Sequence, residues 1–342
     1  MHRHGRYVCQ AHPGVTGRTH SSAVRGGAFL IADIGATNAR FALLNDPSSA
    51  VAGQPSVTLP TADYRTTRAL LESVRAALSI EALDAACLAV AGAVTDGRAS
   101  ITNGILSLDA GEIGDVLGCR VELVNDFAAL AHGVPRLTEV RWTGGVLHAE
   151  GVTVVIGPGS GLGMSARVPL GTGAVVLASE GGHGNLAPGN ALEQELLVLL
   201  SREHDPVTWE TVLSGPGLVN LYRAMAQLWG AQPEPATPEW VSEQGSDAGD
   251  PICHQTLETF FGLLGSAAGN VALIMGARGG VYVGGGIAPK LVEFAASSPM
   301  RRRFDERGAL SDYVAGIPLG IIMDAQPGLT GAAECLRLTL ES

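Results

Sequence analysis

Lysine is almost missing from this sequence of 342 residues, in which Lys290 is the single example. A phosphate-binding P-loop needs a lysine directly after its glycine turn, and the chain contains no Gly-Lys pair. The early-strand lysine of protein kinases is missing too. If the protein binds nucleotide phosphates, it must therefore use backbone amides, hydroxyl groups and a metal ion.

Cysteine and positive charge are also sparse. The five cysteines lie far apart, with no CxxC pair and no Cys/His cluster, which argues against a disulfide framework and a structural zinc site. The formal net charge is −11. An acidic surface repels nucleic acid and anionic membranes, so we expect neither as a partner. The scattered, odd-numbered cysteines are typical of a reducing cytoplasm, where we expect the protein. No uninterrupted apolar run approaches the length of about 18 residues that a membrane span needs.

The chain is long enough for about two domains, and 46% of its residues are hydrophobic, as in globular proteins. Residues 1–27 are polar and contain no secretory signal, so we expect a disordered extension there. Beyond it, apolar runs alternate between strand and helix character, which predicts an α/β fold. The predicted strands are 28–32, 39–44, 86–94, 121–125, 152–156, 163–168 and 319–323, with a strand and glycine turn at 279–286. The predicted helices are 66–78, 127–134, 190–203, 207–213, 216–229, 255–277 and one from near Gly328, with a surface loop at 232–240.

Two strand-turn-strand units open the two halves of the chain. The first turn, DIGATN (33–38), places a carboxylate, backbone N–H groups and a hydroxyl near one point, which suits phosphate oxygens with Asp33 holding Mg²⁺ through water. The second, GPGSGLG (157–163), does not fit the dinucleotide fingerprint because Leu162 stands where its last glycine belongs. Either turn alone is equally typical of an ordinary hairpin, but a pair could hold a polyphosphate between two domains.

Three further segments carry polar groups next to glycines or strand ends. VGGGIAPK (283–290) suits close contact with a nucleoside, although a helix-entry turn explains it as well. Asn125 and Asp126 follow a strand; locally they favour a helix N-cap over a general base. SEGGHGN (179–185) contains Glu180 and His183, which can bond sugar hydroxyls, although a single histidine is more often structural.

Together these segments resemble the bacterial glucokinase family, within the superfamily of sugar kinases, actin and chaperone ATPases. ADIGATNARFALL, VNDFAALAHGV, GPGSGLG, EGGHGNLAP, SGPGLVNLYRA and GGVYVGGGIAPK follow the family's motifs in order, from about Ile31 to Leu340. The resemblance implies a two-domain actin-like (ribonuclease H-like) α/β fold with a cleft. The implied boundaries are 28–135 plus 327–342 for the small domain and 136–326 for the large one.

The resemblance also implies a role for each matched residue. Asp126 becomes the base that deprotonates the sugar 6-hydroxyl, which overturns the local preference for a cap, although both roles are compatible. The implied sugar ligands are Asn103, Asn125, Asp126, Glu180, His183 and Glu210. The implied ATP ligands are Ala32, Asp33, Ile34, Gly35, Ala36, Thr37, Gly159, Ser160, Gly161, Gly284 and Gly285.

The implied activity is phosphorylation of glucose by ATP and Mg²⁺, in a protein expected to form a homodimer. A kinase for another hexose or an N-acetylhexosamine, and a sensor that binds ATP and sugar without turnover, remain open. The sequence departs from the family at Ala36, where a second glycine is usual, so the turn must use a conformation that alanine can reach. Ser160 replaces the usual threonine and keeps its hydroxyl. The cysteine-rich zinc motif and N-terminal helix-turn-helix of the related repressor–kinase group are both missing.

Overall fold

The computed structural model describes residues 27–101, 104–148, 150–171, 173–246 and 249–341. Its first sheet has five strands in the order β3-β2-β1-β4-β8. These are β1 (Phe29–Ile34), β2 (Asn38–Leu44), β3 (Ser56–Pro60), β4 (Ala85–Val90) and β8 (Arg120–Asn125). Strands β1, β4 and β8 run parallel, so their carboxyl ends lie at one edge of the sheet.

Alternation along β1 assigns its side chains to two separate cores. Leu30, Ala32 and Ile34 pack with α1 (Thr67–Ala77) and α2 (Ala110–Leu117) on one face. Ile31 packs on the other face with α12 (Pro327–Glu341) and with Ala129 of α3 (Asp126–Gly133). Because successive strand residues point to opposite faces, Asp33 lies on the α12 side, where a Cβ on Gly328 would meet the Asp33 carboxylate at 2.7 Å.

The second sheet has six strands in the order β12-β11-β10-β13-β14-β9. They are β9 (Val140–Trp142), β10 (Thr153–Pro158), β11 (Leu162–Leu170), β12 (Gly173–Ser179), β13 (Gly280–Val283) and β14 (Leu319–Ile322). A group of helices packs against it and extends beyond it: α4 (Ala191–Leu200), α5 (Trp209–Val212), α6 (Gly215–Leu228), α7 (Pro238–Ser246), α8 (Pro251–Met275), α9 (Val292–Ser297), α10 (Met300–Asp305) and α11 (Ser311–Ala315). A third, small sheet joins β5 (Val94–Thr95), β6 (Arg98–Ser100) and β7 (Ser107–Asp109).

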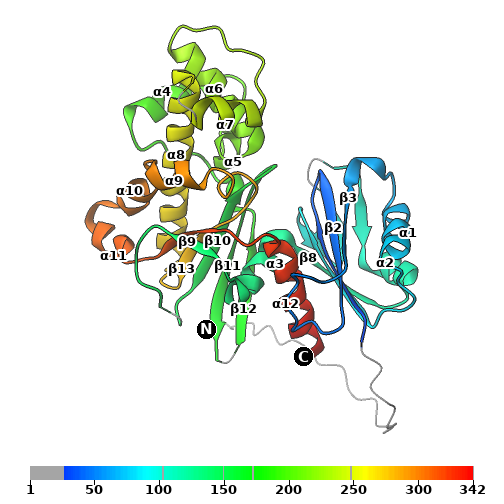
Figure 1. Ribbon diagram of the computed structural model, residues 1–342. Helices are drawn as coiled ribbons and strands as arrows, with labels where there is room; N and C mark the ends of the chain where they lie inside the picture. The colour runs from blue at the N-terminus through cyan, green and yellow to red at the C-terminus, as the bar shows by residue number, and fades with distance from the viewer. Residues whose placement is uncertain (1–26, 102–103, 149, 172, 247–248, 342) are drawn as a thin grey trace, which may run out of the picture.

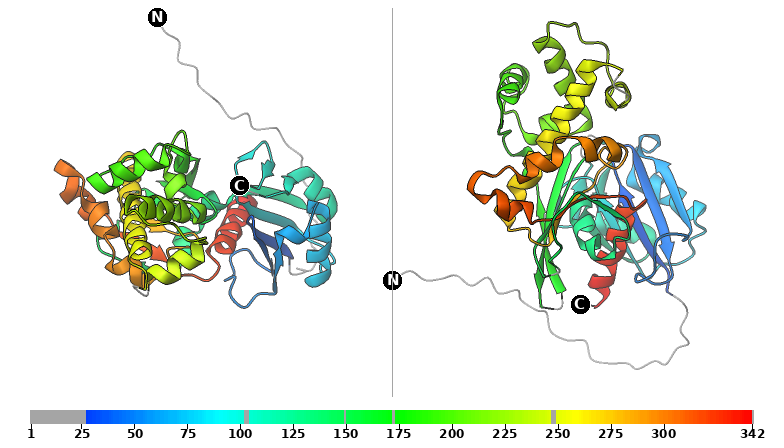
Figure 2. Two further views of the ribbon diagram at one scale, coloured as in Figure 1. Left: turned by 90° about the horizontal axis from the view of Figure 1, so that it is seen from above. Right: turned by 60° about the vertical axis from the view of Figure 1, so that its left-hand side comes forward.

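Helices α3 and α12 lie between the two large sheets, as Figures 1 and 2 show. Their backbones approach closely: a Cβ on Gly133 would meet the Gly331 backbone at 2.9 Å, and one on Gly331 would overlap the carbonyl of Ala129. Only glycine at both positions permits this approach. The two helices, about 200 residues apart in the sequence, thus form one layer between the sheets.

The long helix α8 is apolar enough to pass a length-and-composition test for a membrane span, but 72% of its apolar window is buried inside the molecule. Phe260, Phe261 and Leu264 of α8 are fully buried in the core between the second sheet and its helices. A buried helix of this kind is the central support of a globular core. We therefore assign α8 to the protein interior.

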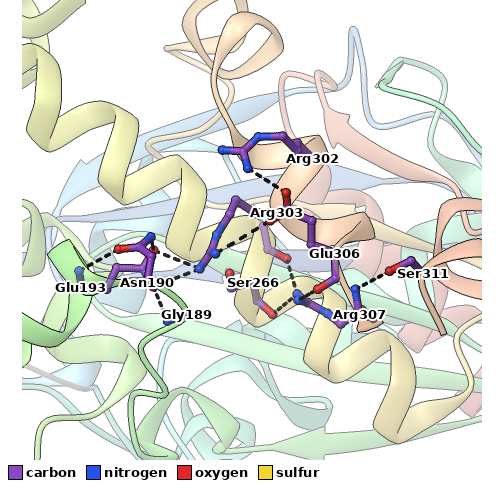
Figure 3. Close-up of polar contacts among 10 residues, drawn as sticks. Gly189, Asn190, Glu193, Ser266, Arg302, Arg303, Glu306, Arg307 and Ser311 are labelled. Atoms are coloured by element: carbon purple, nitrogen blue, oxygen red, sulfur yellow. Dashed lines mark hydrogen bonds and ion pairs between the residues drawn. The ribbon is translucent and has the colours of Figure 1, made fainter. Parts of the chain in front are cut away.

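A buried ion pair fixes the outer helices to one another (Figure 3). Arg303 of α10 donates from Nη2 to both carboxylate oxygens of Glu193 in α4, at 3.0 and 2.9 Å. The same carboxylate accepts from Gly189 N and Asn190 Nδ2. Arg307 donates from Nη2 to the carbonyl of Ser266 in α8 at 2.7 Å. Because the Glu193 side chain is only 4% exposed, the hydrogen bonds from Arg303, Gly189 and Asn190 replace the water that its carboxylate has lost.

Most predicted elements are confirmed, including both hairpins and the long helix, with boundaries moved by a few residues. The loop predicted at 232–240 ends early, because α7 begins at Pro238. Several short elements were not predicted, among them β3, β9, β12, α2 and α9–α11. The predicted extension at 1–27 lies outside the described residues except for Gly27. Four of the five cysteines are described, and all four are free thiols.

Candidate active site

The first phosphate turn, residues 33–38, connects β1 to β2 at the carboxyl edge of the first sheet. Gly35 N donates to Asn38 O at 2.9 Å, which closes the turn. Among described non-glycine residues, only Ser79 and Asp96 have positive φ. Ala36 therefore occupies the turn with an ordinary backbone conformation. The alanine that departs from the family pattern imposes no backbone strain here.

Thr61 supports this turn from β3 and the short helix after it, a role that the sequence did not predict. Its buried Oγ1 donates to Ala36 O at 2.8 Å and lies 3.1 Å from Gly35 O, while its N–H donates to Thr37 O at 3.0 Å. Thr37 is exposed at the tip of the turn. By contrast, the side chains of Ala32 and Ile34 lie in the core, so only their backbones could take part in ligand binding.

Asp33, near the end of β1, and Asp126, at the start of α3 directly after β8, both lie at the carboxyl edge of the first sheet. Burial raises the pKa of the Asp33 carboxyl, although the nearby Arg40 guanidinium, 3.4 Å away, acts to lower it. Burial first, and then the negative charges of Asp33 and Glu180, raise the pKa of Asp126 from 3.8 to about 7. The charges of Asp33 and Glu180 thus act on the Asp126 carboxyl at the start of α3. Such mutual repulsion favours a bound cation or a shared proton.

Asn125 is the N-cap of α3, as its local sequence predicted, and Asp126 is the first helical residue. Asn125 Oδ1 accepts from Ala128 N at 3.0 Å, and its Nδ2 donates to Gly92 O at 3.1 Å. Asp126 Oδ1 accepts from Phe127 N at 2.9 Å and from Asn125 Nδ2 at 3.2 Å. The capping role therefore belongs to Asn125, which leaves the Asp126 carboxylate oriented at the helix start.

The second phosphate turn, residues 157–163, connects β10 to β11 and lies against the triple-glycine segment. Gly284 N donates to Ile156 O and Gly286 N to Pro158 O, at 2.8 and 3.1 Å. A Cβ on Gly157 would meet Gly284 C at 2.6 Å. Gly285 has a φ of +81°, a conformation that favours glycine. The second turn and Gly284–Gly285 are therefore one backbone unit, with no helix directly after the glycines because α9 starts at Val292.

Next to this unit is a cavity of about 320 Å³ that the sequence did not reveal. Its lining residues come from α6, α7 and the segment after the glycines: Leu218, Pro238, Glu239, Ser242, Glu243, Ser246, Gly286, Ile287, Lys290 and Leu291. Its volume lies in the range of small-ligand pockets. The cavity could not be predicted from the sequence, because its lining comes from three separate segments and α7 begins inside the predicted Pro-rich loop.

Glu210 contacts the end of the second phosphate turn, His183 lies beside Glu210, and Glu180 precedes the short helix Gly181–His183. His183 Nε2 lies 4.0 Å from Glu210 Oε1, and the His183 side chain is 59% exposed. Glu210 Oε2 accepts from Leu162 N at 2.7 Å. Glu210 is therefore no ordinary surface residue of a helix. Asn103, the remaining predicted sugar ligand, lies outside the described residues.

Among the described residues, no group of three or more His, Cys, Asp or Glu side chains forms a metal site. A metal ion at Asp33 would therefore take most of its ligands from water and phosphate, as Mg²⁺ usually does with one or two carboxylates. The repelling charges of Asp33 and Asp126 provide the negative potential that such a cation requires. The donor atoms thus fit Mg²⁺ in the company of a polyphosphate.

Comparison with known proteins places these features in one family. The Glucokinase family model matches residues 30–339. The chain belongs to the glucokinase family. A glucokinase of Aromatoleum aromaticum is 42% identical over 315 residues, which cover 90% of this chain and 94% of that protein.

Solved structures of the family and its neighbours share the fold. A glucokinase from an Antarctic psychrotroph superposes with a TM-score of 0.79 at 34% identity, covering 91% of this chain and 99% of that one. A ROK family glucokinase from Streptomyces griseus, in complex with glucose and AMPPNP, superposes with a TM-score of 0.61 at 19% identity, covering 90% and 99%. The chain has the two-domain actin-like fold of these sugar kinases, as its sequence predicted.

Proposed function

We propose that this protein is a glucokinase that transfers the γ-phosphoryl group of ATP to the 6-hydroxyl of D-glucose and supplies glucose 6-phosphate to glycolysis. The observation that carries the proposal is Asp126, a carboxyl with a pKa of about 7 at the start of α3, within the electrostatic influence of Asp33 and Glu180. A base with a pKa near the working pH accepts a proton effectively in the transition state. Family membership supports the choice of substrate.

Asp126 acts as the base in this proposal. The hydrogen bonds from Phe127 N and Asn125 Nδ2 fix Oδ1 and the plane of the carboxylate. We assign Oδ2 as the oxygen that accepts the proton of the 6-hydroxyl while the hydroxyl oxygen attacks the γ-phosphorus. Phosphoryl transfer is largely positioning and charge stabilisation, so the contribution of Asp126 depends on this fixed orientation.

The proposed sugar ligands are Asn103, Asn125, Asp126, Glu180, His183 and Glu210. The Nδ2 of Asn125 already donates to Gly92 O and Asp126, so a hydroxyl would bond the second lone pair of Oδ1. Glu210 Oε1 and His183 Nε2 face one another at 4.0 Å, and a sugar hydroxyl could bond both. Such polar groups reject a sugar that lacks the matching hydroxyl, because a buried partner is then left unpaired.

ATP would bind along the two phosphate turns and the glycine segment. The proposed contacts are the backbone of residues 32–35, Ala36 and Thr37 in the first turn, Gly159, Ser160 and Gly161 in the second, and Gly284 and Gly285 beside it. We assign the nucleoside to the cavity between α7 and Gly286–Leu291. Mg²⁺, when bound at Asp33 through water, would neutralise the developing phosphate charge. Asp33 itself would orient those waters with Arg40 holding its carboxylate.

We propose that residues 28–135 with 327–342 form the small domain and residues 136–326 the large one. Separate cores on the two large sheets, with α12 packed on the first sheet, support this division. Closure of a cleft between the domains would exclude the water that otherwise hydrolyses ATP. We further propose a cytoplasmic homodimer with no nucleic-acid or membrane partner, in keeping with the acidic composition.

A coupled assay of ADP release, run with a panel of hexoses and N-acetylhexosamines, tests the proposed function. We expect glucose to give the highest kcat/KM and phosphate to appear on the 6-hydroxyl. A higher kcat/KM with another hexose would move the assignment to that sugar. Binding of ATP and glucose without any ADP release would identify a sensor and overturn the proposal.

A further inference from the structure

The segment 207–215 contacts two parts of the candidate site at once. On one side it pairs with the sugar loop, residues 179–186. Leu186 N donates to Val207 O at 3.0 Å, and Trp209 N donates to Gly184 O at 2.9 Å. An isolated β-bridge joins Asn185 to Thr208 between these bonds. The sugar loop and the segment that leads into α5 therefore move as one unit.

On its other side, the same segment holds the second phosphate turn. Leu162 N donates to Glu210 Oε2 at 2.7 Å, and Gly215 N donates to Gly159 O at 2.8 Å. Both ends of the turn are thus attached to residues 210–215. A Cβ on Gly161 would overlap Glu210 Oε2, so glycine is required where the carboxylate lies against the turn.

Glu210 is the shared element of these two contacts. Its Oε2 accepts from the phosphate turn, while its Oε1 faces His183 Nε2 of the sugar loop at 4.0 Å. The sugar loop also touches the turn directly, because a Cβ on Gly182 would overlap the carbonyl of Leu162. The Glu210 side chain is 26% exposed. Its hydrogen bond to Leu162 is therefore partly shielded from water, and a carboxylate acceptor makes it stronger than a neutral bond.

We propose that Glu210 is a positioning residue for the second phosphate turn, and that through this carboxylate sugar binding and ATP binding strengthen one another. A hydroxyl that bonds Oε1 limits rotation of the carboxylate and so fixes the N–H of Leu162 and the turn before it. The sugar half of this inference rests on the proposed function. Because coupling between two sites is reciprocal, a nucleotide that orders the turn must also raise the affinity for sugar.

Two conservative variants separate the role in the turn from a role in sugar binding alone. Glu210→Gln keeps the length of the side chain and an oxygen that can accept from Leu162 N. Glu210→Asp keeps the charge but is one methylene shorter, so it cannot reach that N–H from the same backbone. We measure the affinity for AMPPNP with Mg²⁺ by calorimetry, without sugar. His183→Ala, which removes a side chain of the sugar loop, is the matched control.

We expect Glu210→Asp to weaken AMPPNP binding by about tenfold, as loss of a hydrogen bond to a charged group implies. Glu210→Gln should remain within about threefold of wild type, and His183→Ala should not change AMPPNP affinity. Equal AMPPNP affinities for Glu210→Asp and wild type, with both folded by circular dichroism, would overturn the positioning role.

The second arm repeats the titrations with saturating glucose. Wild type should bind AMPPNP more tightly with glucose than without it, and Glu210→Asp should lose most of that difference. An undiminished difference in Glu210→Asp would overturn the coupling. Failure of the proposed function is distinguishable, because a wild type that binds AMPPNP but does not phosphorylate glucose still shows the sugar-free difference between the Asp and Gln variants.

Discussion

Replacing Asp126 by asparagine removes a charge from the start of α3 and keeps an oxygen for the hydrogen bonds that Phe127 N and Asn125 Nδ2 donate to Oδ1. In the folded protein the pKa of this carboxyl is raised from 3.8 to about 7, first by burial and then by the charges of Asp33 and Glu180. At about 1.4 kcal/mol for each pH unit, this corresponds to about 4 kcal/mol at most. Because water reaches the partly exposed side chain, we expect a gain in unfolding free energy of about 1–2 kcal/mol.

The sign of the effect follows from proton binding. Between pH 4 and 7 the folded state holds the Asp126 proton and the unfolded chain has released it, so the stability of the wild type falls as pH rises through this window. Asparagine carries no proton to lose. The advantage of Asp126→Asn over wild type should therefore be complete above pH 7 and less than half as large at pH 5.

Thermal unfolding of both proteins at pH 5 and pH 8, without sugar, nucleotide and Mg²⁺, measures this difference. We expect the midpoint of Asp126→Asn to exceed that of wild type by about 1–3 °C at pH 8. Asp63→Asn, at an exposed position, is the control. Asp126→Asn should also lower kcat by about 10²–10⁴ while it still binds sugar. A variant no more stable than wild type at pH 8 would refute the electrostatic reasoning, and wild-type turnover would refute the base assignment.

Four further predictions address the pH dependence, the sugar loop, the first turn and the buried ion pair. The kcat/KM of wild type for glucose should fall about tenfold per pH unit below pH 7, as Asp126 takes up a proton; a flat profile from pH 5 to 8 would contradict this. His183→Ala should raise the KM for glucose and leave AMPPNP affinity unchanged, so an unaltered glucose affinity in calorimetry removes His183 from the site. Thr61→Val, which leaves Ala36 O without its donor, should raise the KM for ATP by about fivefold to tenfold, and an unchanged KM would show that the turn needs no such support. Glu193→Ala should cost about 3–5 kcal/mol in urea unfolding because it leaves Arg303 buried without its partner; a loss under about 1 kcal/mol would mean that water replaces the carboxylate.

The sequence was informative wherever a local pattern has one structural outcome. The apolar runs around DIGATN and GPGSGLG predicted both hairpins, although not the close approach of Gly157 to Gly284 that joins the second turn to the glycine segment. It was uninformative where function depends on contacts between distant segments. Thr61 lies more than twenty residues from the turn that it supports, and Glu210 is 48 residues from Leu162. Nothing near either residue indicates its partner.

Family resemblance, rather than local pattern, decided between cap and base at residues 125 and 126. Local sequence favours a cap, and the structure assigns that cap to Asn125 through its bond with Ala128 N. Two adjacent residues of similar capping propensity cannot be distinguished from sequence alone. The pKa of Asp126 could not be predicted either, because it depends on burial and on charges from Asp33 and Glu180, which only the folded chain brings close.

The packing of α12 on the first sheet affects the order in which the protein is made. Leu329, Ala332 and Leu336 of α12 bury one face of that sheet, against Ile31 and Cys87. The ribosome synthesises α12 about 300 residues after β1, so the first sheet keeps an apolar face uncovered until α12 has been made. The second sheet and its helices, which lie between β8 and α12 in the sequence, can form their own core before α12 covers the first sheet. Helix α12 therefore completes the core of the first sheet only after the whole second sheet has been synthesised.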